Sequence, residues 1–134
     1  MTAFFDTNIL IYAQERSDKG EVARGLLAAG GILSVQVLNE FAVVSRRKQD
    51  RAWPEIAEAI DDVLALVSKP LAVTLTTHQE ARRLAAAHGF SFYDALIVAA
   101  AIEAGCDRLY SEDMQQGWAI GGVSIINPFR EEAR

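Results

Sequence analysis

The sequence predicts an α/β fold, a three-layer α/β/α sandwich around a central parallel sheet of about five short strands. Short apolar runs of strand length alternate along the chain with longer segments of helical periodicity. Strands that are separated by helices join through right-handed crossovers, which make neighbouring strands parallel. The chain has 134 residues, of which 51% are hydrophobic. We therefore expect residues 1–134 to form a single domain with its own core.

The first half of the chain contains two predicted strands and three predicted helices. A short buried strand at residues 3–5 comes first. A helix at residues 21–29 stops at a pair of glycines, and a second strand follows at residues 32–34. A helix at residues 36–48 carries apolar residues on one face. Another helix begins at Pro54, because proline suits the first helical turn.

The second half contains three more predicted strands and two more helices. Residues 71–75 form the third predicted strand. A helix is then expected to begin at Thr77, because Thr77 to Glu80 match the capping-box pattern. Residues 94–104 form a helix that is almost entirely apolar. We expect this helix to lie between the sheet and another layer, or in a dimer contact. Strands at residues 108–111 and 123–126 complete the predicted sheet.

Composition limits the location and the possible partners of the protein. The net charge of −5 is unfavourable for a protein that binds nucleic acid through its overall charge. The single cysteine, Cys106, cannot form an internal disulfide and fits a small buried residue in a reducing compartment. No secretory signal is recognisable, and the longest apolar run, residues 95–102, is shorter than the roughly 20 residues of a membrane span. We therefore expect a cytoplasmic protein with no membrane partner.

Four acidic residues fall where an α/β sheet assembles its functional sites, near the carboxyl ends of the strands. Asp6 follows the first predicted strand, and Asp113 lies just past the fourth. Glu40 lies in the second turn of the helix that follows the second strand. These three acids share one edge of the predicted sheet. Asp94 joins them only if its helix enters from the same side.

Three of these acids also have a purely structural interpretation. Asp6 and Asp113 could each cap a helix, and Asp94 has the spacing to complete a capping box with Ser91. Capping does not explain Glu40, which lies at the margin of the apolar face of its helix. An unpartnered carboxylate in such a place costs several kcal/mol or becomes protonated. The position of Glu40 therefore favours a functional role.

Converging carboxylates need protons or a cation, because two of them about 4 Å apart repel by roughly 4 kcal/mol at an effective dielectric near 20. Oxygen ligands select Mg²⁺ or Mn²⁺ over zinc, and neither His78 nor His88 lies beside any of the acids in sequence. Such ions activate water and neutralise charge during displacement at phosphorus. Asp6 would anchor the metal, and Thr7 and Asn8 are placed to hydrogen bond to Asp6 or to a phosphate.

Four sequence segments that carry the acids together resemble the PIN domain, and especially the small bacterial VapC-type toxins. The segments are FFDTNILIYA, SVQVLNEF, SFYDALIVAAA and LYSEDMQQG, and they follow the order and spacing of the family over nearly the whole chain. The resemblance implies that the metal-binding and catalytic residues are Asp6, Glu40, Asp94 and Asp113. It implies that the accompanying polar positions, which we expect to contact substrate, are Thr7, Asn8 and Ser111.

The resemblance also implies an activity and partners. Proteins of this type are Mg²⁺- or Mn²⁺-dependent endoribonucleases that cut single-stranded or structured RNA and halt translation. They form homodimers, and a small antitoxin protein neutralises them, often by inserting a basic side chain among the acids. From charge alone, we expect the basic run that contains Arg46 and Arg47 to help hold RNA. A solvated helix face is the alternative interpretation of that run.

Other functions remain open at the level of sequence. The same nuclease could act in RNA maturation or decay, and the chain could instead be a catalytically silent PIN-like binding module. A phosphatase or phosphorelay domain is disfavoured. Asn8 occupies the place of the second aspartate of a haloacid-dehalogenase-like site, and the last lysine, Lys69, is too early for a receiver domain.

Overall fold

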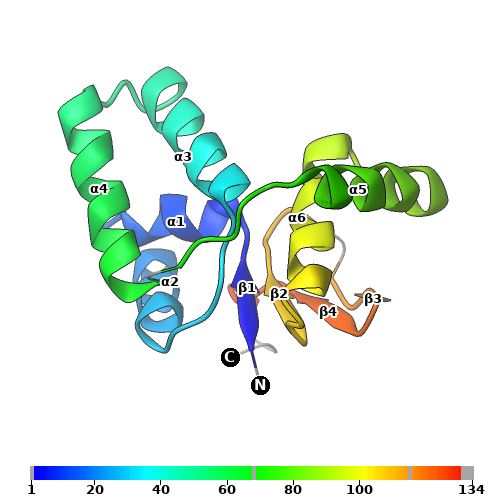
Figure 1. The fold of residues 1–134 in the computed structure, drawn as a ribbon. Helices are drawn as coiled ribbons and strands as arrows, with labels where there is room; N and C mark the ends of the chain where they lie inside the picture. Colours follow the sequence, from blue (N-terminus) through cyan, green and yellow to red (C-terminus); the bar gives the residue numbers. More distant parts are fainter. Residues whose placement is uncertain (1, 68, 115, 131–134) are drawn as a thin grey trace.

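In the computed structural model, which describes residues 2–67, 69–114 and 116–130, a four-stranded sheet lies among six helices (Figure 1). The strands are β1 (Ala3–Phe5), β2 (Arg108–Tyr110), β3 (Ala119–Ile120) and β4 (Val123–Ile126), in the spatial order β1-β2-β4-β3. β1, β2 and β4 are parallel, whereas β3 pairs with β4 in the antiparallel direction. The predicted α/β class is confirmed, with a mixed sheet instead of a fully parallel one.

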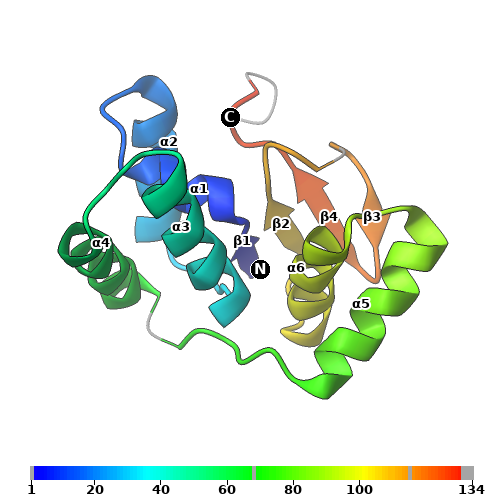
Figure 2. The ribbon, with the colours of Figure 1, turned by 90° about the horizontal axis from the view of Figure 1, so that it is seen from above.

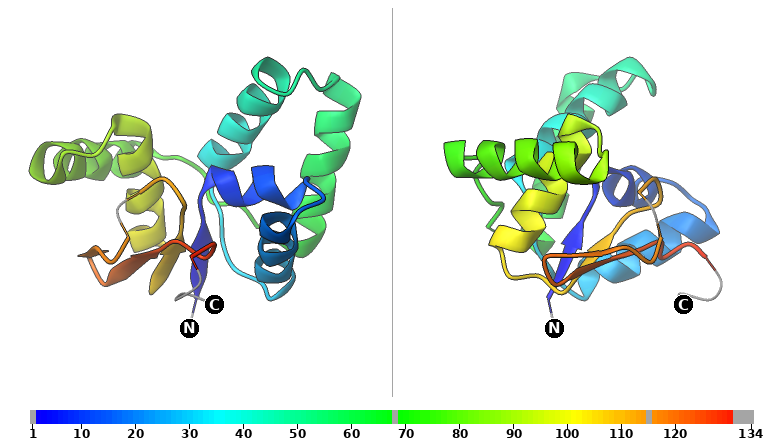
Figure 3. Two further views of the ribbon diagram at one scale, coloured as in Figure 1. Left: turned by 180° about the vertical axis from the view of Figure 1, so that it is seen from behind. Right: turned by 90° about the vertical axis from the view of Figure 1, so that its right-hand side faces the viewer.

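The helices form two groups, one on each side of β1. They are α1 (Thr7–Ala13), α2 (Asp18–Ala28), α3 (Val35–Arg47), α4 (Trp53–Leu66), α5 (Leu75–His88) and α6 (Phe92–Glu103). α1 to α4 gather on one side, and α5 and α6 lie on the other, as the view from above shows (Figure 2). The view from behind shows the same separation (Figure 3). α6 contacts β2 and β4 directly, and α5 packs against α6.

Two of the predicted strands are wrong in extent. Within residues 32–34 a single residue forms a parallel bridge with Phe4, and within residues 71–75 a single residue forms a parallel bridge with Ser34. Both segments stop early because a helix N-cap lies within each of them. Ser34 accepts a hydrogen bond from the first turn of α3, and Thr74 does the same for α5. The chain therefore turns into a helix before the ladder can extend.

The start of α5 also differs from the prediction of a capping box at Thr77 to Glu80. The N-cap is Thr74, whose hydroxyl accepts a hydrogen bond from the Thr77 N–H at 3.2 Å. The Thr77 hydroxyl in turn accepts from the Thr74 N–H at 3.2 Å and donates to Glu103 at 2.9 Å. A threonine thus fills the place that the capping-box pattern gives to glutamate or glutamine. The hydroxyl of Thr77 also ties α5 to the end of α6.

One strand was not predicted. β3 is only two residues long and pairs with β4 across a turn formed by Gly121 and Gly122. Both glycines have positive φ angles, 57° and 83°, which are the values that a two-residue hairpin turn requires. The glycine pair is recognisable as a turn in the sequence, but a two-residue strand has too little periodicity to be recognised.

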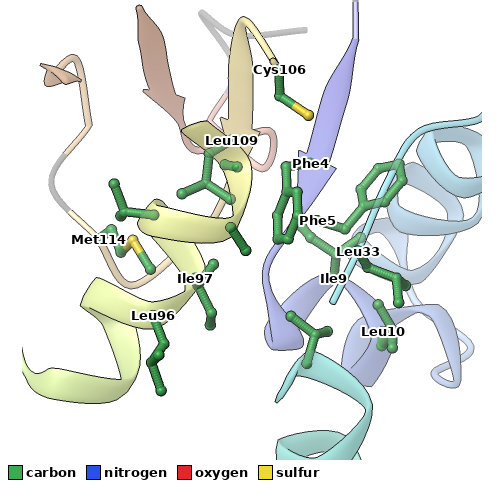
Figure 4. Close-up of a cluster of buried hydrophobic side chains, with 14 of the residues drawn as sticks. Phe4, Phe5, Ile9, Leu10, Leu33, Leu96, Ile97, Cys106, Leu109 and Met114 are labelled. Atoms are coloured by element: carbon green, nitrogen blue, oxygen red, sulfur yellow. The ribbon is translucent and has the colours of Figure 1, made fainter. Parts of the chain in front are cut away.

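The apolar helix α6 forms part of the core, as one of its two predicted placements requires. Its residues from Ala95 to Ala101 are buried in an unbroken run. The cluster in Figure 4 includes Phe4 of β1, Leu10 of α1 and Ile97 of α6, none of which is exposed to solvent. Cys106 is buried at the margin of the core, as predicted. Burial of α6 fixes the position of Asp94 in its first turn.

No described helix is by itself both long and apolar enough to cross a membrane. α5 and α6 meet the length and composition criteria only when they are taken together, as a pair bent by 116°. Most of the apolar residues of α6 lie in the core, so they are already covered by protein.

Candidate active site

Asp6 lies at the junction of β1 and α1, with one carboxylate oxygen engaged on each side. Oδ1 accepts a hydrogen bond from the Thr7 N–H at 2.7 Å, so Asp6 does cap α1. Oδ2 accepts a hydrogen bond from the Ser111 hydroxyl at 2.6 Å. The Asp6 N–H donates to the carbonyl of Tyr110 at 3.0 Å, which joins the carboxyl ends of β1 and β2. Capping therefore accounts for only one of the two oxygens of this carboxylate.

The ionised form of Asp6 is destabilised by its surroundings. The pKa of Asp6 is raised from 3.8 to about 7, and burial is the largest cause. The negative charges of Asp94 and Glu40 contribute to this rise, while the hydrogen bonds from Ser111 and Thr7 act in the opposite direction. Only 5% of the residue is exposed, so water stabilises the charge weakly. A cation near Asp6 would favour the ionised form at neutral pH.

Glu40 is half-buried on α3 and is linked to Asp6 through one side chain. The Thr7 hydroxyl donates to Glu40 Oε2 at 2.7 Å, while the Thr7 N–H donates to Asp6. Burial raises the pKa of Glu40, the hydrogen bond from Thr7 opposes this, and the charge of Asp94 raises it again. Thr7 thus holds two carboxylates from different elements, which is the polar contact that the apolar margin of α3 requires.

Asp94 lies in the first turn of α6, at the same edge of the sheet as Asp6. Its N–H donates to the hydroxyl of Ser91, the N-cap, at 3.3 Å. Burial raises the pKa of the half-buried Asp94 carboxyl, and the charge of Asp113 adds to this effect, while Ser91 opposes it. The condition on which the prediction for Asp94 depended is met, because α6 does enter from the side of the other acids.

Asp113 is exposed in the loop that follows β2. Asn8 Nδ2 donates to Asp113 Oδ2 at 3.2 Å, and Asn8 Oδ1 accepts from the Glu112 N–H at 3.3 Å. Asn8 therefore attaches this loop to α1. Among the residues that the structure describes, no helix begins after Asp113, so the capping interpretation of Asp113 is not supported.

A single cleft of about 880 Å³ connects these residues. All four acids line it, with Thr7 and Asn8 beside them, and its other walls include Tyr93, Arg47 and Lys48. Ser111 does not line the cleft but is fully buried beneath Asp6. The cleft is therefore acidic where β1, α3 and α6 meet and basic toward the end of α3.

The donor set of the cleft suits Mg²⁺, although the acids are not pre-assembled around one point. Within the described residues, no three Asp, Glu, His or Cys side chains are grouped tightly enough to hold a metal ion. Mg²⁺ retains several waters and uses only one or two protein carboxylates, so it does not need such a cage. The side chains are oxygen donors, and burial raises the pKa of Asp6, Glu40 and Asp94. Nearby positive charge would relieve that destabilisation.

Comparison with known proteins now identifies the family. The family model described as the PIN domain matches residues 3–116, which is most of the chain. The chain belongs to the PIN domain family. A search of curated proteins found no significant match.

Solved structures with this PIN fold are similar to the chain over most of its length. VapC20 of Mycobacterium tuberculosis, described as a sarcin-ricin loop cleaving toxin, has a TM-score of 0.69 at 22% identity, covering 84% of this chain and 90% of VapC20. A toxin-antitoxin complex from Klebsiella pneumoniae has a TM-score of 0.69 at 20% sequence identity, covering 96% of this chain and 98% of the matched chain. VapBC2 of Rickettsia felis, bound to a promoter DNA fragment, has a TM-score of 0.67 at 22% sequence identity, covering 93% of this chain and 97% of the matched chain. At these identities the comparisons establish the fold.

The structure separates the two arginines that were expected to hold RNA. Arg47 lines the cleft of the PIN domain, together with Lys48. Arg46 does not line the cleft. Its Nη1 donates to the carbonyl of Arg51 at 3.1 Å, and its guanidinium carbon lies 5.8 Å from the centre of the Trp53 ring. Arg46 therefore stabilises the turn between α3 and α4, and Arg47 is better placed to meet a substrate.

Glu112 belongs to a cluster that the sequence analysis did not identify. Its carboxylate accepts hydrogen bonds from the Tyr12 hydroxyl and from Lys19 Nζ, each at 2.6 Å. Burial alone would raise the pKa of Glu112, but the bonds from Lys19 and Tyr12 outweigh this effect and lower it. The Tyr12 ring packs edge-on against Phe129, and the Lys19 ammonium lies 4.8 Å from the centre of the Tyr12 ring. Glu112 is thus charge-compensated, unlike its neighbour Asp113.

Only one part of this cluster has a recognisable signal in the sequence. Tyr12 follows Asn8 by four residues on α1, so both lie on the same helix face. Lys19 and Glu112 are 93 positions apart, and nothing local to either predicts their contact. Together with Asn8, the cluster holds the loop that carries Asp113 against α1.

Proposed function

We propose that this PIN domain is a Mg²⁺- or Mn²⁺-dependent endoribonuclease and the toxin of a toxin-antitoxin pair. One observation carries the proposal. Acids from β1, α3, α6 and the loop after β2 line one cleft, and burial raises the pKa of three of them. A protein gains no stability from desolvating several like charges together, so a site that binds cations explains the arrangement better than structure alone.

The residues of the cleft suit hydrolysis of a phosphodiester. The residues that would hold the metal, directly or through the waters that Mg²⁺ retains, are Asp6, Glu40, Asp94 and Asp113. When bound, the divalent ion supplies an activated water and neutralises the charge that develops on the phosphate. Thr7 fixes the carboxylates of Asp6 and Glu40 relative to each other, and Ser111 fixes the second oxygen of Asp6. Asn8 holds Asp113, and its amide is also within the cleft, where it can meet a phosphate.

The charge distribution supports RNA as the substrate, despite the net charge of −5. Arg47 and Lys48 form a basic wall at the end of α3, where they can attract the phosphate backbone. A bound divalent ion would reduce the negative charge of the opposite wall. The overall charge therefore understates the affinity of the cleft for RNA.

The toxin assignment draws on the structural neighbours. One of them is described as a toxin that cleaves the sarcin-ricin loop, and another is described as a toxin-antitoxin complex. The partner by analogy with the toxin-antitoxin complex is a small cognate antitoxin protein that inhibits this chain. A cytoplasmic homodimer is the further expectation from the sequence and its family resemblance. Growth arrest on expression, reversed by such an antitoxin, separates this role from RNA maturation or decay.

Cleavage of RNA by the purified protein is expected to require a divalent ion. With Mg²⁺ or Mn²⁺ present, discrete cuts appear in structured and single-stranded RNA, and excess EDTA lowers the rate at least about 100-fold, because the acids alone cannot activate water. The measurement is the rate of appearance of mapped RNA ends, followed by restoration with added Mg²⁺. Cleavage that EDTA leaves unchanged would overturn the proposal, as would a lack of cleavage with either metal.

A further inference from the structure

The proposed chemistry makes no use of Tyr93. This residue lies next to Asp94 in the first turn of α6 and lines the cleft. Its side chain is large and flat, yet 60% of the residue is exposed. An aromatic ring in this position adds nothing to the core, so its contribution is to the surface of the cleft.

The ring of Tyr93 has an aromatic neighbour and is otherwise largely exposed. Phe92 packs edge-on against it, with ring centres 6.1 Å apart, and Phe92 itself meets His78 at 5.2 Å. The helix that carries Tyr93 is anchored by the buried run that begins at Ala95. Tyr93 is therefore a positioned aromatic surface on a rigid element, which limits the entropy lost when a ligand stacks on it.

Two other aromatic residues, Tyr12 and Trp53, are less suited to bind a ligand in the cleft. Tyr12 also lines the cleft, but its hydroxyl is bonded to Glu112 and its ring is packed by Phe129 and Lys19. Trp53 is 57% exposed but does not line the cleft. Tyr93 thus combines exposure, support and a place beside the acids.

We propose that Tyr93 forms a stacking subsite for an unpaired nucleobase of the RNA that the acids cleave. The inference rests on the proposed nuclease function and adds a substrate preference to it. Arg47 and Lys48 supply positive charge for the backbone in the same cleft, and the acids next to Tyr93 act on the phosphate. A nucleotide that meets a basic wall with its phosphates and Tyr93 with its base satisfies both kinds of surface. A base inside a duplex cannot stack on a side chain, so the subsite favours single strands, loops and bulges.

A stopped-flow experiment with a 2-aminopurine base in a short single-stranded RNA tests this subsite. Mixing the full-length protein with this RNA and Mg²⁺ records binding as a rapid quench and cleavage as a slower phase. Tyr93→Ala is expected to raise the Kd about 5- to 150-fold and to remove the quench, because stacking on an aromatic side chain contributes that much per base. The loss should be larger in the Kd than in the single-turnover cleavage rate at saturation, because Tyr93 is proposed to contact the base and not the phosphate.

Two further variants distinguish stacking from simple apolar contact. Tyr93→Phe keeps the ring and should bind within about twofold of the native protein, whereas Tyr93→Leu keeps apolar volume without a π surface and should resemble Tyr93→Ala. The preference of the native protein for this RNA over its duplex form should shrink in the alanine and leucine variants. All three variants should have the same unfolding temperature as the native protein, because the Tyr93 side chain lies outside the core.

The outcomes separate this inference from the proposed function. If the native protein cleaves RNA and Tyr93→Ala binds and quenches as the native protein does, the stacking subsite is wrong and the nuclease stands. If Tyr93→Leu matches the native protein, the contact is apolar and stacking is again wrong. A native protein that neither binds nor cleaves RNA would overturn both proposals.

Discussion

An Asp94→Asn protein is expected to fold normally and to lose about 100- to 1,000-fold in its rate of RNA cleavage, the range found when one electrostatic contact to a transition state is removed. Asparagine has the shape of aspartate but no negative charge. The backbone bond from residue 94 to Ser91 survives the change, so the start of α6 remains capped. Cleavage is followed under single-turnover conditions with saturating Mg²⁺, and folding is checked by circular dichroism and thermal unfolding.

Asp61→Asn provides the matched control for this prediction. Asp61 is exposed on α4 and does not line the cleft. Its substitution by asparagine removes the same charge as Asp94→Asn. The cleavage rate of Asp61→Asn should equal that of the native protein. Expression in cells gives a second comparison, in which the native protein and Asp61→Asn arrest growth and Asp94→Asn does not. Cleavage at the native rate by a folded Asp94→Asn protein would remove Asp94 from the active site.

The second large effect concerns stability in the absence of metal. The pKa of Asp6 is about 7 in the folded protein and 3.8 as an ordinary carboxyl, so the folded state holds its proton more tightly. Stability from this group is complete below pH 4 and is lost as the pH rises through 7. The loss amounts to about 4 kcal/mol at most, since one pKa unit corresponds to about 1.4 kcal/mol. Chemical unfolding in EDTA between pH 4 and pH 8 measures it.

The variant Asp6→Asn should remove most of this pH dependence. Asparagine caps helices about as well as aspartate, and its amide does not ionise. The variant should therefore be more stable than the native protein at pH 8. Glu40 and Asp94 also have raised pKa values, so a smaller loss with rising pH remains in the variant. Parallel stability curves for the two proteins across this pH range would show that Asp6 is not destabilised by its burial.

The sequence predicted the place of the acids better than it predicted the sheet. Asp6 and Asp113 follow strands whose apolar runs are distinct, and Glu40 is out of place on the apolar margin of α3, which is a local signal. The predicted extents of the strands at 32–34 and 71–75 were wrong, because a one-residue bridge followed by a helix cap has the same local composition as a short strand. Periodicity cannot separate these cases over three to five residues.

Contacts between distant side chains could not be predicted from the sequence. The bond between Lys19 and Glu112 and the bond between Ser111 and Asp6 depend on how α1, α2 and the loop after β2 pack together. The exposure of Tyr93 likewise depends on which face of α6 the core covers. Composition showed that α6 would be buried, but not that Tyr93 would remain outside.

Calorimetric titration with Mn²⁺ tests the central claim most directly, because it asks whether the acidic cleft is a metal site without reference to RNA. Two adjacent acids give a matched pair: Asp113, which lies in the cleft beside Asn8, and Glu112, which Lys19 and Tyr12 already compensate. The native protein and Glu112→Gln should bind Mn²⁺ with similar affinity, while Asp113→Asn and Asp94→Asn should bind at least about tenfold more weakly. Absence of Mn²⁺ binding by the native protein, or equal binding by all four proteins, would contradict the account.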